Sequence, residues 1–166
     1  TDLHVQGYFV YDSKKSGSTT VSHLRFDPQP IDSTYLGQQA SFVGVHQWNF
    51  VQRQDVMQLA APGATVLINS PFPADEVWAR LPADVQIRML ELGVRLHAID
   101  AAAVAREAGL PGRVNTVMQA CFFALSGVLP TDEAIAELRH AIERADPGAA
   151  DLLRRVLDHL GIRKAV

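Results

Sequence analysis

The chain has 166 residues, a length that suits one domain with one hydrophobic core. Hydrophobic residues make up 48% and charged residues 20%, which is an ordinary globular composition. The formal net charge of −3 argues against a nucleic-acid partner, because phosphate binding over a large surface needs a basic face. No apolar run reaches the roughly 18–20 residues that span a bilayer, so we expect no membrane partner either.

Cys121 is the single cysteine of the chain, and it excludes several kinds of site. One thiol cannot form an internal disulfide, hold an iron–sulfur cluster or build a Cys-rich zinc site. It fits a reducing compartment, and we expect a cytoplasmic protein. Its apolar neighbours predict a small core residue, not a nucleophile. Neither H-E-x-x-H nor G-x-S-x-G occurs, so the sequence predicts no catalytic residue and no metal ligand.

The first predicted elements are two strands. Residues 4–12 are rich in aromatic and β-branched side chains, and residues 19–26 alternate between two faces. The polar, glycine-containing segment 13–18 between them predicts a turn, so the two strands are expected to form a hairpin.

The rest of the chain alternates between strands and helices. We expect strands at 42–46, 65–68 and 94–99, and helices at 55–61, 74–80, 84–92, 101–108 and 114–128, followed by one after Pro130 and one over 149–160. Gly93 fits the left-handed position after a helix, and Asp100 fits a helix cap. The order predicts a single-domain α/β fold, a layered mixed sheet covered by helices.

Polar residues lie at the ends of three predicted strands. These are Asp12-Ser13, Asn69-Ser70 and Asp100. Ligands of α/β sheets bind beyond the carboxyl ends of the strands, so this convergence predicts a binding site. The alternative for Asn69 and Ser70 is a turn that caps the next helix.

Two loops have the chemistry of an anion site. The first offers two ammonium groups, hydroxyls and a glycine, in Ser13, Lys14, Lys15, Ser16 and Gly17. The alternative is a solvated hairpin turn whose lysines protect a sheet edge. The second loop, 109–115, places two glycines, Arg113 and Asn115 at the start of a buried helix, where free N–H groups attract anions. Its alternative is a turn whose arginine pairs with a carboxylate.

The residues from Gln6 to Gly17 also carry a family resemblance. This run, with VSHLRF at 21–26, LINSP at 67–71, GRVNTVMQ at 112–119 and CFF at 121–123, resembles the gamma-type domain of pyruvate:ferredoxin oxidoreductases. The single-chain pyruvate:flavodoxin form, which is associated with nitrogen fixation, is the most similar type. The resemblance covers about residues 2–145, so we expect a gamma-type domain at 1–145 and a C-terminal helical tail at 146–166.

The resemblance implies a function for the domain. The family converts pyruvate, by oxidative decarboxylation, to acetyl-CoA, using thiamine diphosphate, magnesium and iron–sulfur clusters, which would lie on other domains or subunits. Electrons leave to ferredoxin or flavodoxin. This domain would help to bind coenzyme A, with Lys14 and Lys15 contacting its phosphates within the Ser13–Gly17 loop. The rest of the pocket would come from Asn69, Ser70, Arg113 and Asn115.

Two departures from the family pattern leave other functions open. The family's glycine-rich segment before the position of Thr1 is missing, and its Tyr-Gly-Lys-Lys-Gly-like run is replaced after Ala145. We therefore expect the isolated domain to be inactive alone. The alternatives are a non-catalytic scaffold or interaction module, and the same domain in an oxidoreductase for another 2-oxoacid.

Overall fold

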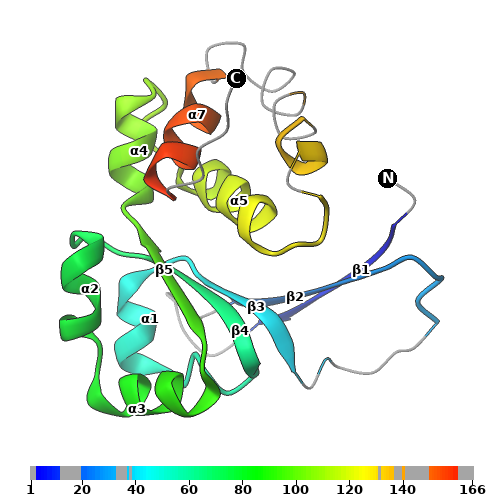
Figure 1. The fold of residues 1–166 in the computed structure, drawn as a ribbon, viewed down its shortest axis with the longest axis horizontal. Helices are drawn as coiled ribbons and strands as arrows, with labels where there is room; N and C mark the ends of the chain where they lie inside the picture. The colour runs from blue at the N-terminus through cyan, green and yellow to red at the C-terminus, as the bar shows by residue number, and fades with distance from the viewer. Residues whose placement is uncertain are drawn as a thin grey trace. The chain divides into compact units, whose positions relative to one another are not determined.

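The computed structural model describes residues 3–11, 20–32, 37, 39–130, 132–136, 140 and 150–160. The chain divides into two compact units, residues 1–38 and residues 39–166. The helices and strands of both units are drawn in Figure 1.

The first unit contains the predicted hairpin. Strands β1 (His4–Tyr11) and β2 (Thr20–Asp27) pair antiparallel, in a register that runs from His4 opposite Asp27 to Tyr11 opposite Thr20. The alternation of side chains in 19–26 therefore predicted the second strand correctly. The predicted turn at 13–18 lies outside the described residues.

The second unit contains a three-stranded parallel sheet. Its strands are β3 (Ala40–Val45), β4 (Ala60–Asn69) and β5 (Arg95–Ile99), in the order β3-β4-β5. The predicted α/β class with a helix-covered sheet is confirmed, but the predicted mixed sheet is wrong, because the described antiparallel and parallel pairs occur in separate sheets. Because β3, β4 and β5 are parallel, their carboxyl ends meet at one edge.

Helices cover both faces of this sheet (Figure 1). On one face, α1 (Trp48–Arg53) packs on β3, α2 (Ala74–Arg80) on β5, and α3 (Ala83–Leu92) on β4. The other face is covered by α4 (Ala101–Glu107), α5 (Val114–Leu125) and α7 (Ala150–His159), which pack on one another. Residues 132–136 are also helical, and Ile135 joins this second layer.

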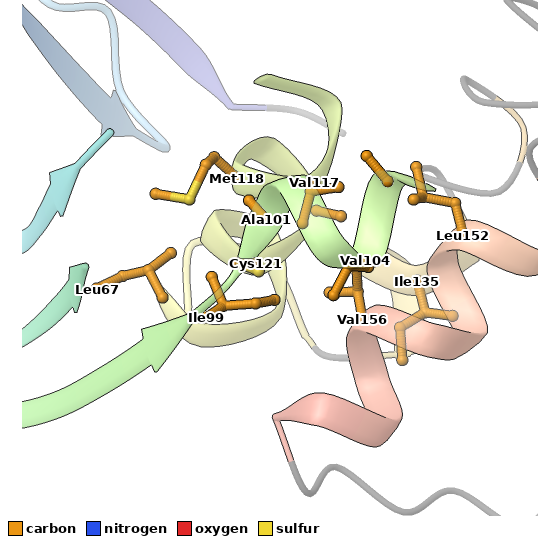
Figure 2. Packing of buried hydrophobic residues seen from close by; sticks show 12 residues of the cluster. Leu67, Ile99, Ala101, Val104, Val117, Met118, Cys121, Ile135, Leu152 and Val156 are labelled. Atoms are coloured by element: carbon orange, nitrogen blue, oxygen red, sulfur yellow. The ribbon is translucent and has the colours of Figure 1, made fainter. Parts of the chain in front are cut away.

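Central strand β4 separates two hydrophobic cores. Leu67 points toward the core made with α4, α5 and α7, whereas Val66 and Ile68 belong to the core made with α1, α2 and α3. All three side chains are fully buried. Figure 2 shows Leu67 and Ile99 of the sheet beside Met118 and Cys121 of α5. A strand that is buried on both faces is expected to be apolar throughout, as this one is from Val66 to Ile68.

One predicted helix between β3 and β4 is wrong, and the predicted strand at 65–68 is present but begins earlier. The helix predicted at 55–61 is a turn, in which the carboxylate of Asp55 accepts a hydrogen bond from the backbone N–H of Met57 at 3.2 Å. An Asp that bonds to nearby backbone competes with helix formation, so the helix α1 lies earlier, at Trp48–Arg53. Strand β4 begins at Ala60, before the predicted start at 65, because Gly63 (φ +74°) lets the chain pass through an irregularity in the β3–β4 register.

Other predicted boundaries are confirmed. Gly93 ends α3 in the left-handed conformation at φ +59°. The Asp100 side chain caps α4 by accepting a 2.8 Å hydrogen bond from the N–H of Ala103. None of the helices within the described ranges combines the length and apolar character that crossing a membrane requires.

Replacing Leu67 tests the two-core arrangement. Leu67→Ala should lower the free energy of unfolding by about 2–5 kcal/mol, because a cavity forms where three helices meet the sheet. The matched control is Leu90→Ala on α3, whose side chain is 69% exposed and whose loss should change stability by less than about 0.5 kcal/mol. Urea unfolding measures both. Equal effects of the two substitutions would contradict the assignment of Leu67 to the core.

Candidate functional site

The carboxyl edge of the parallel sheet is held by the side chain of Asn69. Its Nδ2 donates to the carbonyl oxygen of His46, after β3, at 3.0 Å. Its Oδ1 accepts from the N–H of Ala101, at the start of α4, at 3.1 Å. One amide therefore joins the ends of β3, β4 and β5, so the convergence predicted for Asn69 and Asp100 is present in the structure.

Ser70 continues this edge, but its side chain faces inward. The residue is 1% exposed, and its N–H donates to the carbonyl oxygen of Ile99 at 2.9 Å. The hydroxyl accepts from the N–H of Phe72 at 3.0 Å and donates to the Phe72 carbonyl at 3.4 Å. These bonds build the turn that the alternative for Asn69-Ser70 predicted, but they do not cap α2, whose N-cap is Pro73 without a side-chain hydrogen bond.

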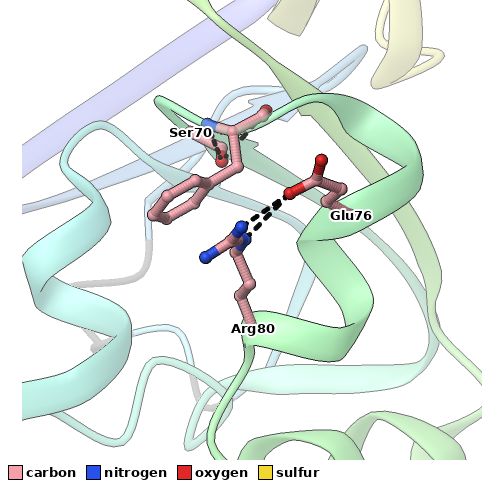
Figure 3. Close-up of polar contacts among 4 residues, drawn as sticks. Ser70, Glu76 and Arg80 are labelled. Atoms are coloured by element: carbon pink, nitrogen blue, oxygen red, sulfur yellow. Dashed lines mark hydrogen bonds and ion pairs between the residues drawn. The ribbon is translucent and has the colours of Figure 1, made fainter.

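A small polar cluster supports the same turn (Figure 3). The guanidinium of Arg80 lies 4.2 Å from the centre of the Phe72 ring and forms a 2.7 Å ion pair with Glu76. Trp48 packs edge-on against the same Phe72 ring, with the ring centres 5.3 Å apart. The Arg80–Glu76 pair is about half exposed, so we expect the ring contacts to stabilise this turn more than the ion pair does.

The start of α4 is closed to an anion. The N–H of Ala101 is bonded to Asn69, and the N–H of Ala103 is bonded to Asp100. Two of the donors that a helix N-terminus would offer are therefore already satisfied by side chains. Asp100 also places a carboxylate where an incoming phosphate would lie.

The loop before α5 is open by comparison. Gly109 (φ +75°) and Gly112 (φ +87°) take left-handed conformations, and the N–H of Leu110 bonds to the carbonyl of Ala105 at 2.8 Å. Helix α5 begins at Val114 without a side-chain cap, and Arg113 and Asn115 are exposed. Within the described residues neither side chain has a hydrogen bond or ion pair. The guanidinium is thus available to a ligand, and the carboxylate partner that the alternative predicted is absent from that part of the chain.

The predicted lysine loop remains a prediction. Asp12 and all five residues of the proposed cradle, Ser13, Lys14, Lys15, Ser16 and Gly17, lie outside the described residues. The structure thus places Asn69, Ser70 and Asp100 together at one edge and describes Arg113 and Asn115 at the start of α5.

Sequence reasoning missed a second polar group, on the sheet face that also carries Leu67. Arg95 donates to the hydroxyl of Thr65 at 3.0 Å, and His97 lies two residues further along β5. Burial, and secondly the nearby charge of Arg95, lower the pKa of His97 below its ordinary value. The signal was available, because two polar side chains alternate with Leu96 and Ala98 along this strand.

Cys121 has the core role that its neighbours predicted. It is fully buried in α5, and burial raises the pKa of its thiol to about 12. A thiol that stays protonated at neutral pH is a poor nucleophile. The structure shows no group of three or more His, Cys, Asp or Glu side chains arranged for a metal ion anywhere in the described part.

A helix-covered parallel sheet with polar residues at its carboxyl edge defines an α/β domain. Comparison with protein families makes this specific. The family described as "Pyruvate ferredoxin/flavodoxin oxidoreductase" matches residues 1–156. The chain therefore belongs to this family.

Curated relatives extend the match at high identity. The chain is 57% identical over 144 residues to a pyruvate-flavodoxin oxidoreductase of Nostoc sp.. It is 51% identical over 145 residues to a probable pyruvate-flavodoxin oxidoreductase of Escherichia coli, and 44% identical over 142 residues to a pyruvate:ferredoxin oxidoreductase of Moorella thermoacetica. These matches cover 86–87% of this chain and 12% of each relative, so the chain spans about an eighth of their length.

Solved structures share the fold. The PORC subunit of pyruvate oxidoreductase from Thermotoga maritima superposes with a TM-score of 0.62 at 16% identity, over 93% of this chain and 76% of that subunit. The gamma subunit of a keto/oxoacid ferredoxin oxidoreductase from Geobacter sulfurreducens gives 0.58 at 16% identity, over 96% and 79%. At this identity the similarity establishes the fold alone.

A single-atom change in Asn69 tests the edge. Asn69→Asp keeps the acceptor for the N–H of Ala101 but replaces the donor with an oxygen that faces the carbonyl of His46. We expect the free energy of unfolding to fall by about 1–2 kcal/mol in denaturant titrations. The control is Asn115→Asp at the exposed start of α5, where an acidic side chain is tolerated and stability should stay within about 0.5 kcal/mol. Unchanged stability in the Asn69 variant would refute the role of this amide.

Proposed function

We propose that this chain is the coenzyme-A-side domain of a pyruvate:ferredoxin or pyruvate:flavodoxin oxidoreductase, with the domain at residues 1–145 and a helical tail at 146–166. Family membership over residues 1–156 is the observation that carries the proposal. The high identity to enzymes named for pyruvate and flavodoxin supports it. In the whole enzyme, pyruvate would be decarboxylated oxidatively to acetyl-CoA.

The proposed pocket uses loops for binding and the sheet edge for support. Lys14 and Lys15 would pair with phosphate oxygens of coenzyme A, while the hydroxyls of Ser13 and Ser16 and the backbone at Gly17 would donate hydrogen bonds. The exposed guanidinium of Arg113 would supply a second cationic group, which can contact a phosphate through two parallel hydrogen bonds.

The two residues at the end of β4 would act differently from the loops. Each of the two polar atoms of Asn69 has one hydrogen bond and retains the capacity for a second, so this amide could meet a ligand without releasing the edge. Ser70 is buried and would position the turn. Asn115, exposed in the first turn of α5, would offer an amide beside Arg113.

This chain's part in the reaction would be to bind and orient the thiol substrate. Thiamine diphosphate, magnesium and the iron–sulfur clusters would lie on other domains, since one buried cysteine cannot ligate a cluster. Ferredoxin or flavodoxin would accept the electrons from the whole enzyme. The single free thiol is compatible with the cytoplasm.

A scaffold without a coenzyme A site is the second candidate. The observation that favours it is the engagement of Asn69 and Ser70 in hydrogen bonds of the fold. Calorimetry separates the two, because a scaffold would give no heat with coenzyme A and would still associate with the thiamine-binding domains.

Replacing both lysines tests the proposed function. In the whole oxidoreductase, Lys14→Ala with Lys15→Ala should raise the KM for coenzyme A by about 10-fold or more and leave the KM for pyruvate unchanged, because charge-assisted bonds to phosphate contribute about 1.5–3 kcal/mol each. Steady-state kinetics with coenzyme A as the varied substrate measures the change.

The matched control removes a cation elsewhere. Arg88→Ala on α3 breaks an exposed pair with Glu91, in which the two side chains are 50% and 57% exposed. Its KM for coenzyme A should equal that of the unchanged enzyme. A double-lysine variant with the same KM as this control would remove the lysine loop from the site.

A further inference from the structure

One face of the β1–β2 hairpin is mainly apolar, and several of its side chains are exposed. The register places Val5 opposite Phe26, Gly7 opposite Leu24 and Phe9 opposite Ser22, so these side chains share a face. Val5 is 60% exposed, Phe9 57% and Leu24 52%. We call the surface formed by Val5, Phe9, Leu24 and Phe26 the apolar hairpin face.

The opposite face of the hairpin is organised by its own contacts. The rings of Tyr8 and His23 stack with centres 4.5 Å apart, and the Tyr8 hydroxyl accepts a 2.9 Å hydrogen bond from the N–H of Gly37. Arg25 donates to the side chain of Gln6 at 3.5 Å. Gln6, His23 and Arg25 are polar, Tyr8 carries a hydroxyl, and all four side chains are partly buried.

Most of the exposed large hydrophobic side chains in the described part of the chain lie on this hairpin. Five of the eight large hydrophobic side chains that are exposed in the described part of the chain lie on these two strands. Val5, Phe9 and Leu24 lie on the apolar hairpin face, and Val10 and Val21 lie on the opposite face. A two-stranded sheet alone is marginally stable in water, and contiguous exposed apolar surface marks an interaction site. Leu24 lies over Gly7. A Cβ added at Gly7 would lie 3.2 Å from Leu24 Cδ2, so Leu24 occupies space that a side chain at Gly7 would need.

We propose that the apolar hairpin face docks against an apolar surface of another domain of the same oxidoreductase. This inference rests on the proposed function, because it requires the rest of that enzyme. We choose another domain as the occupant because the aligned segment is only 12% of each matched relative. The relatives are about eight times longer than this segment, so they contain further domains that could cover the face. The face lacks charged residues, so an apolar partner surface matches it better than an acidic or basic one.

Thiol labelling measures whether the face is covered. Cys121 is buried with a pKa raised to about 12, so in the 166-residue chain an introduced cysteine is the one reactive thiol. Leu24→Cys should react rapidly with N-ethylmaleimide in this chain. In the whole oxidoreductase its rate, read by peptide mass mapping, should fall by about tenfold or more. Hydrogen exchange of β2 in both unsubstituted proteins gives a second reading if the variant folds poorly.

The matched control lies on the other face of the same strand. Val21→Cys replaces a side chain that is 40% exposed, and its labelling rate should differ by less than about twofold between the two proteins. Equal rates for Leu24→Cys in the two proteins would overturn the proposal. Slow labelling of Leu24→Cys in the 166-residue chain would also overturn it, because this chain or a second copy would then cover the face. Equal protection of Leu24→Cys and Val21→Cys in the whole oxidoreductase would overturn it as well. The KM for coenzyme A is a separate measurement, so a failed lysine test leaves the labelling result valid.

Discussion

The arrangement of the candidate site depends on the hydrogen bonds made by one amide side chain. Asn69 joins the segment after β3 to the start of α4, while the backbone of Ser70 is bonded to the end of β5. Parallel strands bring their carboxyl ends together, but the loops that follow must still be held in place. The Asn69 amide does this without adding a further charge beside the carboxylate of Asp100.

The division between scaffold and loops follows from the packing. Strand β4 is buried on both faces, so its interior positions serve two cores and offer nothing to a ligand. Groups that remain available for binding are on loops, with the exposed Arg113 as the described example. The starts of α4 and α5 show the same contrast. The Asp100 side chain accepts a hydrogen bond from a backbone N–H at the start of α4, whereas no side chain caps the backbone N–H groups at the start of α5. In a coenzyme A site of this design, substitutions in the loops would change the affinity for coenzyme A, and substitutions in the sheet would change the stability of the fold.

The sequence predicted most of the fold because its patterns are local. Alternation identified β2, Gly93 and Asp100 marked helix ends correctly, and the apolar run of α5 indicated a buried helix. The error at 55–61 arose because an Asp55 turn and a strand containing Pro62-Gly63 look like a helix with a stop signal. The alternation of Arg95 and His97 along β5 is visible in the sequence, but the hydrogen bond from Arg95 to Thr65 depends on strand register, which sequence spacing does not reveal. The resemblance supplied the family, which matches residues 1–156, and no local pattern could have supplied it.

The central proposal is that two cationic loops of this domain would hold the phosphates of coenzyme A. Hydrogen exchange of the whole oxidoreductase, with and without saturating coenzyme A, tests it most directly. Exchange in segments 12–19 and 109–116 should slow by about tenfold when coenzyme A binds and should not slow with pantetheine, which has the thiol arm without the phosphates. Unchanged exchange in both segments at saturating coenzyme A would contradict the account.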